Sequence, residues 1–169
     1  MRTLSKQEAQ GLLREEVLQL SPEYGGCLPC AIGAKTYAPH LLVRENDIGV
    51  CTLEQFASRA GQLIIVPKQH VEHMQDVPWS MYRDLQYLAW EAAATLEKTL
   101  QPRRVFIAQL GAVKQRSTSY THISISVVPI YEADERSRPS HVFSWSRGVQ
   151  MYEDDEADEL ADKIREAWG

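Results

Sequence analysis

Apolar residues recur along this chain with a helical period in some segments and with a strand period in others. Near the start, four of them have helical spacing: Ala9, Leu13, Val17 and Leu20. Ser5 and Glu8 stand at the beginning of this pattern, with the spacing of a capping box. The sequence therefore predicts a first helix over residues 6–20, within an N-terminal segment 1–22.

The longest helical pattern lies in the middle of the chain. Its apolar positions follow Pro78 and are Met81, Leu85, Leu88, Ala92, Leu96 and Leu100. Pro102 ends the pattern, because proline has no amide hydrogen to continue a helix. A third pattern ends at Trp168 and follows an acidic run at 153–159, where the helix dipole favours acidic side chains. We expect this C-terminal helix within residues 150–169.

Short apolar runs separated by turn-forming residues predict strands at 41–43, 48–51 and 62–66. Two further strands are expected at 105–110 and 118–128. In the second of these, apolar residues alternate with polar ones such as His122, so the polar side chains are expected on one face. The whole pattern predicts an α+β fold: a mostly antiparallel sheet with the long helix packed on it and a helix at each end.

Composition narrows the class of protein. The chain has 169 residues, of which 44% are hydrophobic and 24% charged, with a formal net charge of −5. These values, without an internal repeat or a break in composition, indicate one globular domain over residues 1–169. The acidic balance argues against a nucleic-acid partner. Residues 2–10 are polar, and no apolar run approaches the length of a membrane span, so we expect a cytoplasmic protein without a membrane partner.

Three cysteines give an odd count with no disulfide framework, as expected in a reducing compartment. Cys51 lies in an apolar run and is expected to be a small buried residue. Cys27 and Cys30 form the motif C-L-P-C, which holds a metal, forms a redox pair, or contains two unconnected thiols in a turn. Redox pairs usually lie at a helix N-terminus beside a parallel βαβ unit. Glycine and proline around Cys27 predict a loop instead, which favours the metal interpretation.

A tetrahedral zinc site needs two more ligands besides the thiolates, and neutral imidazoles complete such a shell. The chain has five histidines: His40, His70, His73, His122 and His141. His70 follows a predicted strand and His122 lies on the polar face of another, so both are held in fixed positions. The alternative for each is an ordinary surface or hydrogen-bonded histidine.

Four segments over residues 27–130 carry a more specific signal. C-L-P-C is followed by A-G-Q-L-I-I-V-P-K-Q-H-V-E-H, a long helix and T-H-I-S-I-S-V-V-P. In this order and at these intervals they resemble the histidine triad (HIT) superfamily of nucleotide hydrolases and transferases. The resemblance implies a HIT-like fold and a two-fold homodimer in which the sheets join. In the zinc-bearing branch, the ligands of the structural Zn²⁺ correspond to Cys27, Cys30, His70 and His122.

The same resemblance places residues around a nucleotide, and there the chain departs from the family. The family's nucleophilic histidine corresponds to Ser124, and the third histidine of its signature to Ser126. Phosphate-side residues correspond to Thr118 and Gln109. An acidic residue that binds ribose corresponds to Glu54; the alternative for this residue is a solvated glutamate in a turn.

These substitutions leave three functional hypotheses. A serine hydroxyl needs a base to remove its proton, unlike imidazole, so the family reaction is expected to fail. The first hypothesis is a zinc-containing purine-nucleotide-binding or regulatory protein without a nucleophile. The second is a nucleoside phosphate hydrolase or nucleotidyl transferase that uses Ser124 or direct water attack. The third is an interaction module whose nucleotide pocket is filled by side chains.

Overall fold

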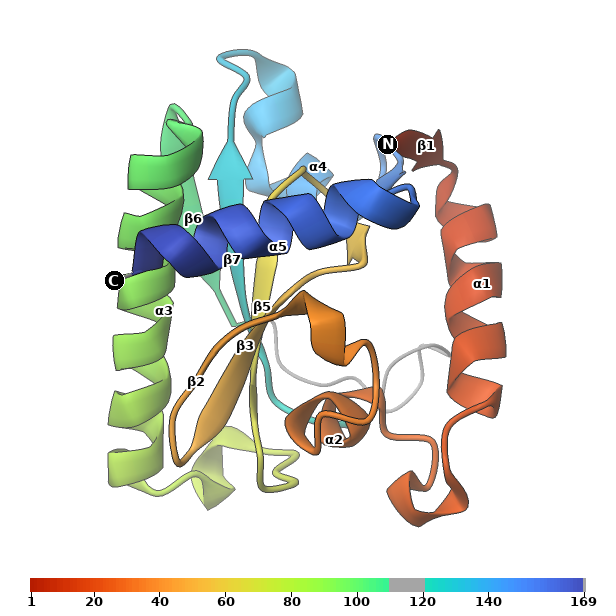
Figure 1. The fold of residues 1–169 in the computed structure, drawn as a ribbon, viewed down its shortest axis with the longest axis vertical. Helices are drawn as coiled ribbons and strands as arrows, with labels where there is room; N and C mark the ends of the chain where they lie inside the picture. Colours follow the sequence, from red (N-terminus) through yellow and green to blue (C-terminus); the bar gives the residue numbers. More distant parts are fainter. Residues whose placement is uncertain (110–120, 169) are drawn as a thin grey trace.

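The computed structural model describes residues 1–109 and 121–168. Its centre is a five-stranded antiparallel sheet with the strand order β2-β3-β5-β7-β6 (Figure 1). The strands are β2 (Leu42–Glu45), β3 (Gly49–Leu53), β5 (Leu63–Pro67), β6 (Arg104–Ala108) and β7 (Ile125–Ile130). Each neighbouring pair is antiparallel. The predicted α+β class is confirmed.

Two long helices cover one face of this sheet. Helix α3 (Trp79–Leu100) and helix α5 (Asp154–Trp168) bury side chains in one core with the strands, among them Leu88, Ile164 and Ile65. Full burial of each such side chain contributes roughly 2 kcal/mol. Helix α3 ends where predicted, because Gln101 turns into the left-handed region (φ 49°) just before proline.

Two short helices pack on the other face of the sheet. Helix α2 (Leu28–Gly33) lies against β3 and β5. Gly33 allows this approach, since a Cβ atom there would lie 3.3 Å from the Cα atom of Lys68. Helix α4 (Pro139–Phe143) packs through Val142 on Val128 and Ile130 of β7, which are buried on this face of the sheet.

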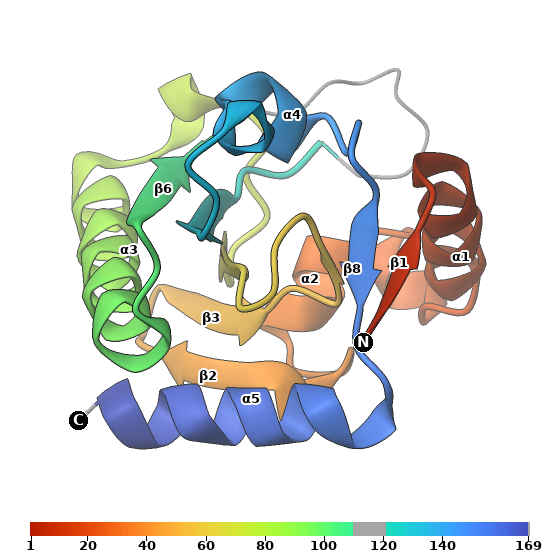
Figure 2. The ribbon, with the colours of Figure 1, turned by 90° about the horizontal axis from the view of Figure 1, so that it is seen from above.

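A second, smaller sheet carries helix α1 (Lys6–Leu18), on the opposite side of the molecule from α3 (Figure 2). Its strand order is β1-β8-β4, with β1 (Arg2–Leu4), β8 (Val149–Met151) and β4 (Phe56–Ala57). The capping box predicted for α1 is present, because Ser5 and Glu8 accept hydrogen bonds from each other's backbone amides. The apolar pattern of the sequence does not predict these three strands, which have only two or three residues each.

Two local expectations are wrong. The predicted loop around C-L-P-C contains α2, because Pro29 in the first turn suits a helix start. The last predicted strand begins later than expected: residues 121–124 precede β7, and residues 118–120 lie outside the described ranges. His122 is therefore not on a strand face. Within the described residues, 1–109 and 121–168, no helix is long and apolar enough to cross a membrane.

Candidate metal centre

The N-terminus of α2 places two sulfur atoms close together. Cys27 is the N-cap residue of α2, and Cys30 follows in the first turn of the helix. Residues three apart in a helix lie on the same face, so both thiols point in one direction. Cys27 is buried, and Cys30 is partly exposed. Neither is in a disulfide bond.

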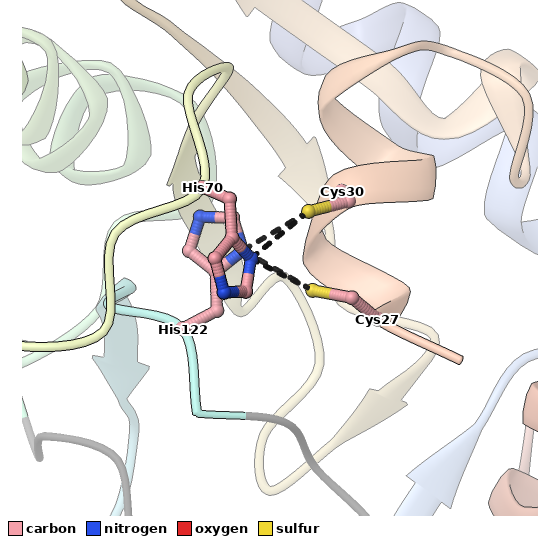
Figure 3. A group of neighbouring side chains, drawn as sticks. All are labelled: Cys27, Cys30, His70 and His122. Carbon is pink, nitrogen blue, oxygen red and sulfur yellow. Dashed lines mark hydrogen bonds between the residues drawn. The ribbon is translucent and has the colours of Figure 1, made fainter. Parts of the chain in front are cut away.

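Two histidines approach these sulfurs from the ends of two inner strands of the main sheet (Figure 3). His70 follows the end of β5, and His122 precedes the start of β7. Because β5 and β7 are antiparallel neighbours, the end of one meets the start of the other. The amide of Ile123 donates a hydrogen bond to the carbonyl of Val71 (2.9 Å), which joins the two segments beside the imidazoles.

The four side chains have the geometry of a metal site. The Nδ1 atom of His70 lies 3.6 Å from Cys27 Sγ and 3.2 Å from Cys30 Sγ. The Nδ1 atom of His122 lies 3.3 Å from Cys27 Sγ and 3.6 Å from Cys30 Sγ. Ligands around a tetrahedral zinc ion would have sulfur–nitrogen distances of about 3.6 Å, given ordinary bond lengths. All four donor atoms lie within 4.8 Å of one another, so the donor set and its spacing both fit zinc.

Burial determines the protonation of two of these ligands. Burial, with the neighbouring His70, lowers the pKa of His122 to about 4, so its imidazole is neutral at pH 7. Burial raises the pKa of Cys27 to about 12, and hydrogen bonding with Cys30 adds to the rise. A reactive redox thiol needs a lowered pKa instead. The helix start suits the redox interpretation, but this raised pKa and the antiparallel sheet do not.

Glu72 also lies at the cluster, although no motif in the sequence assigns a role to this residue. Its Oε1 atom lies 3.3 Å from Nε2 of His70, the ring nitrogen that faces away from the sulfurs. Ligand histidines almost always donate this second N–H to an oxygen. The position two residues after His70, in the segment H-V-E-H, is the only signal in the sequence.

The less buried side of the cluster opens onto a cleft of about 810 Å³. Cys30, His70 and Glu72 line this cleft, together with Lys68 and Tyr24. Metal can therefore reach the four ligands from solvent without passing through the core.

Glu54, the predicted ribose ligand, is placed in a much smaller space. It follows the last residue of β3 and lines a cavity of about 20 Å³, enough for one water molecule. Burial raises the pKa of its carboxyl group to about 7. Tyr37 and Gln55 also line the cavity, and the Tyr37 hydroxyl lies 2.7 Å from Gln55 Oε1. Both side chains are hydrogen-bonded to Glu16 of α1, so α1 holds two of the side chains that line this cavity.

The predicted phosphate-side residues lie at the end of the central strands opposite to Glu54. Gln109 and Ser124 line one small depression with no free volume, 0 Å³. Ser126 lies on β7, paired with Ile64 and Ala108. Thr118 lies outside the described residues. Gln109 and Ser124 therefore lie together, whereas Glu54 lines a different cavity.

No protein-family model matches the chain, and neither does any curated protein sequence. Solved structures do match. A zinc-bound histidine triad family protein from Mycobacterium smegmatis has a TM-score of 0.64 and 20% identity, with 84% of this chain and 92% of that chain covered. A hypothetical histidine triad nucleotide-binding protein from Sulfolobus tokodaii has a TM-score of 0.65 and 15% identity, with 84% and 91% covered. A HIT-like protein involved in cell-cycle regulation from Bartonella henselae has a TM-score of 0.63 and 18% identity, with 81% and 92% covered. At these identities the matches show that the chain has the HIT fold.

Proposed function

We propose that this HIT-fold chain is a zinc-containing protein that binds a purine nucleotide, or acts as a regulator, without the histidine nucleophile of the family. The observation that carries the proposal is the placement of His122 and Ser124. The Nδ1 atom of His122 faces two sulfurs, and its Nε2 atom is buried. When Nδ1 binds a metal, the neutral ring carries its proton on Nε2, so neither nitrogen can accept a proton from Ser124.

A serine in this position needs a base before it can attack phosphorus. In the described part of the chain, no hydrogen bond links the Ser124 hydroxyl to a histidine or a carboxylate. The hydrolase or transferase hypothesis, with Ser124 or a water molecule as the nucleophile, therefore has no supporting contact in the described site.

Cys27, Cys30, His70 and His122 would hold the zinc ion. With four protein ligands the site is closed, so bound zinc would supply stability rather than a reactive water molecule. This agrees with the zinc-bound neighbour of the same fold. The cysteines must lose their protons to bind zinc, so acid should release the metal.

On the nucleotide side, Glu54 would accept hydrogen bonds from ribose hydroxyls. Gln109, Thr118, Ser124 and Ser126 would lie toward the phosphate. One structural neighbour is a hypothetical histidine triad nucleotide-binding protein, and we propose nucleotide binding for this chain as well.

The test is a calorimetric titration of the zinc-loaded protein with AMP, with Glu54→Ala as the variant. Loss of the carboxylate removes hydrogen bonds to the sugar, so we expect saturable binding that the variant weakens about tenfold, corresponding to about 1.4 kcal/mol. A matched control is Glu45→Ala, because Glu45 binds Lys35 and Lys68 on the surface, away from the Glu54 cavity.

One specific observation favours a second candidate, an interaction module. The cavities at the predicted nucleotide residues have volumes of about 20 Å³ and 0 Å³, too small for a nucleoside unless side chains move. The same titration decides between the two candidates. The absence of heat with millimolar AMP would reject the nucleotide site and favour the interaction module.

We also propose that the chain forms a homodimer. In the described sheet, β6 is an edge strand with an exposed Ile107. A second copy that pairs along this edge would cover it.

The three free cysteines agree with the expectation of a cytoplasmic protein.

A further inference from the structure

The two histidines of the metal cluster are held in place by different means. His122 is only 4% exposed and is fixed by the side chains packed around it. The side chain of His70 is 45% exposed and lies at the wall of the open cleft. Packing alone therefore leaves the His70 ring more freedom to rotate than the His122 ring.

The geometry of His70 shows what limits that rotation. Its Nδ1 atom faces both sulfurs, so Nδ1 must carry the lone pair when a metal binds. The proton of a neutral imidazole then resides on Nε2. The Oε1 atom of Glu72 lies 3.3 Å from this nitrogen and can accept that N–H.

The backbone between these two residues is also fixed. Val71 is 5% exposed, and its carbonyl accepts the hydrogen bond from the amide of Ile123. The positions of His70 and Glu72 relative to the second histidine segment are therefore set by the main chain.

We propose that Glu72 is a positioning residue that holds His70 in the tautomer and orientation needed to bind the metal. This inference rests on the proposed zinc site and deepens it. The carboxylate accepts the Nε2 proton, orients the ring toward the sulfurs and increases the basicity of Nδ1. Partners of this kind typically change metal affinity by roughly 10- to 100-fold.

His73 does not replace this interaction. Its Nε2 atom lies 4.0 Å from the other oxygen of Glu72, which is an ion-pair distance only when His73 is protonated. The hydrogen bond to His70 is the closer of the two contacts.

The test compares zinc affinities by competition with a chromophoric chelator, for the full chain and three variants. Glu72→Ala removes the acceptor, so zinc should bind about tenfold more weakly or worse. Glu72→Gln keeps a neutral acceptor oxygen, so its affinity should lie between those of Glu72→Ala and the parent. Glu23→Gln removes a charge from an exposed residue of the same cleft that forms no ion pair with a histidine of the described ranges, so its affinity should stay within about twofold.

A second readout separates positioning from general stability. The Nε2–H signal of His70 in the proton NMR spectrum is protected from exchange when it is hydrogen-bonded. It should be visible in the zinc-loaded parent and in Glu72→Gln, and lost in Glu72→Ala. A role limited to stability would leave this signal unchanged.

Three results would overturn the inference. They are an unchanged zinc affinity in Glu72→Ala, an equal loss in Glu23→Gln, and a His70 signal that persists without the carboxylate. A parent protein that binds no zinc would overturn the proposed metal centre as well. A parent that binds zinc beside an unaffected Glu72→Ala would overturn the role of Glu72 alone.

Discussion

Glu54 shows how strongly the packing around one side chain changes its chemistry. Its pKa of about 7 means that the carboxyl group is about half protonated near neutral pH. A protonated carboxyl group donates one hydrogen bond and accepts others, whereas a carboxylate only accepts. The affinity for ribose hydroxyls should therefore vary with pH around neutrality.

The raised pKa of Glu54 also predicts how stability depends on pH. The folded pKa of about 7 lies above the reference value of 4.5, so the folded state binds more protons between these values. This contribution is fully present below pH 4.5 and is lost as the pH rises to 7. The Glu54→Gln side chain cannot ionise, so the variant lacks this loss of stability. Its free energy of unfolding relative to that of the parent should therefore be higher at pH 8 than at pH 5, by on the order of 2 kcal/mol.

Urea unfolding of zinc-saturated protein at both pH values measures this difference. The exposed Glu15 of α1 gives a matched control, and Glu15→Gln should follow the pH dependence of the parent. If Glu54→Gln also follows the parent, Glu54 does not ionise across this interval.

Residue types and spacing favour a metal role for Cys27 and Cys30 and make His70 and His122 candidates, and the resemblance to the HIT superfamily selects this set of four. The position of Glu72 against His70 depends on side-chain orientation, which spacing does not determine. Two side chains of the Glu54 cavity, Tyr37 and Gln55, are hydrogen-bonded to Glu16, which lies 38 residues before Glu54 in a helix outside the 27–130 core. No local pattern connects these two glutamates.

At the scale of elements, one hydrogen-bonded group links α1 to the main sheet. Tyr37, between α2 and β2, contacts Glu16 of α1 and Gln55, which follows β3. Gln55 Nε2 also donates to Glu16 Oε1 (3.0 Å). Burial raises the pKa of Glu16, so its carboxylate depends on these donors for stability.

Tyr37→Phe should therefore destabilise the protein by about 1–2 kcal/mol, because it leaves partly buried polar groups with fewer partners. Thermal or urea unfolding measures the change. Tyr24→Phe is the control, since the Tyr24 hydroxyl makes no hydrogen bond to the described residues. Equal losses in the two variants would contradict a special role for Tyr37.

Elements with many periodic positions could be predicted, and short ones could not. Helix α3 has 22 residues, and its apolar pattern is unambiguous. Helix α2 has six residues, and β4 has two, so neither contains enough positions to show a period. Their conformation is decided by contacts with distant segments: β4 pairs with β8, nearly 100 residues later.

At the scale of the whole molecule, the outer face of α3 carries exposed aromatic side chains. Trp79, Tyr87 and Trp90 are 74%, 56% and 61% exposed. The rings of Tyr87 and Trp90 lie beside each other, with centroids 5.7 Å apart and planes tilted by 41°. Because α3 packs beside β6, we extend the dimer interface proposed along β6 to this apolar surface.

Trp90→Glu should therefore shift a dimer toward monomer, with at least a tenfold weaker association, because it would bury a charge at the interface. Sedimentation equilibrium measures the constant. Leu18→Glu is the control, since Leu18 is 83% exposed on α1, on the opposite side of the molecule (Figure 2). A monomeric parent, or equal effects of both variants, would contradict the proposed interface.

The metal cluster joins parts of the chain that are far apart in sequence. Its shortest contacts span 40 residues, from Cys30 to His70, and 95 residues, from Cys27 to His122. A bound ion would close both loops at once, like a covalent cross-link, and the entropy lost by loop closure grows only slowly with loop length. One ion at this point would therefore restrict most of the folding core through four side chains, so metal supply would be a step in the maturation of the protein if the proposed zinc site is filled.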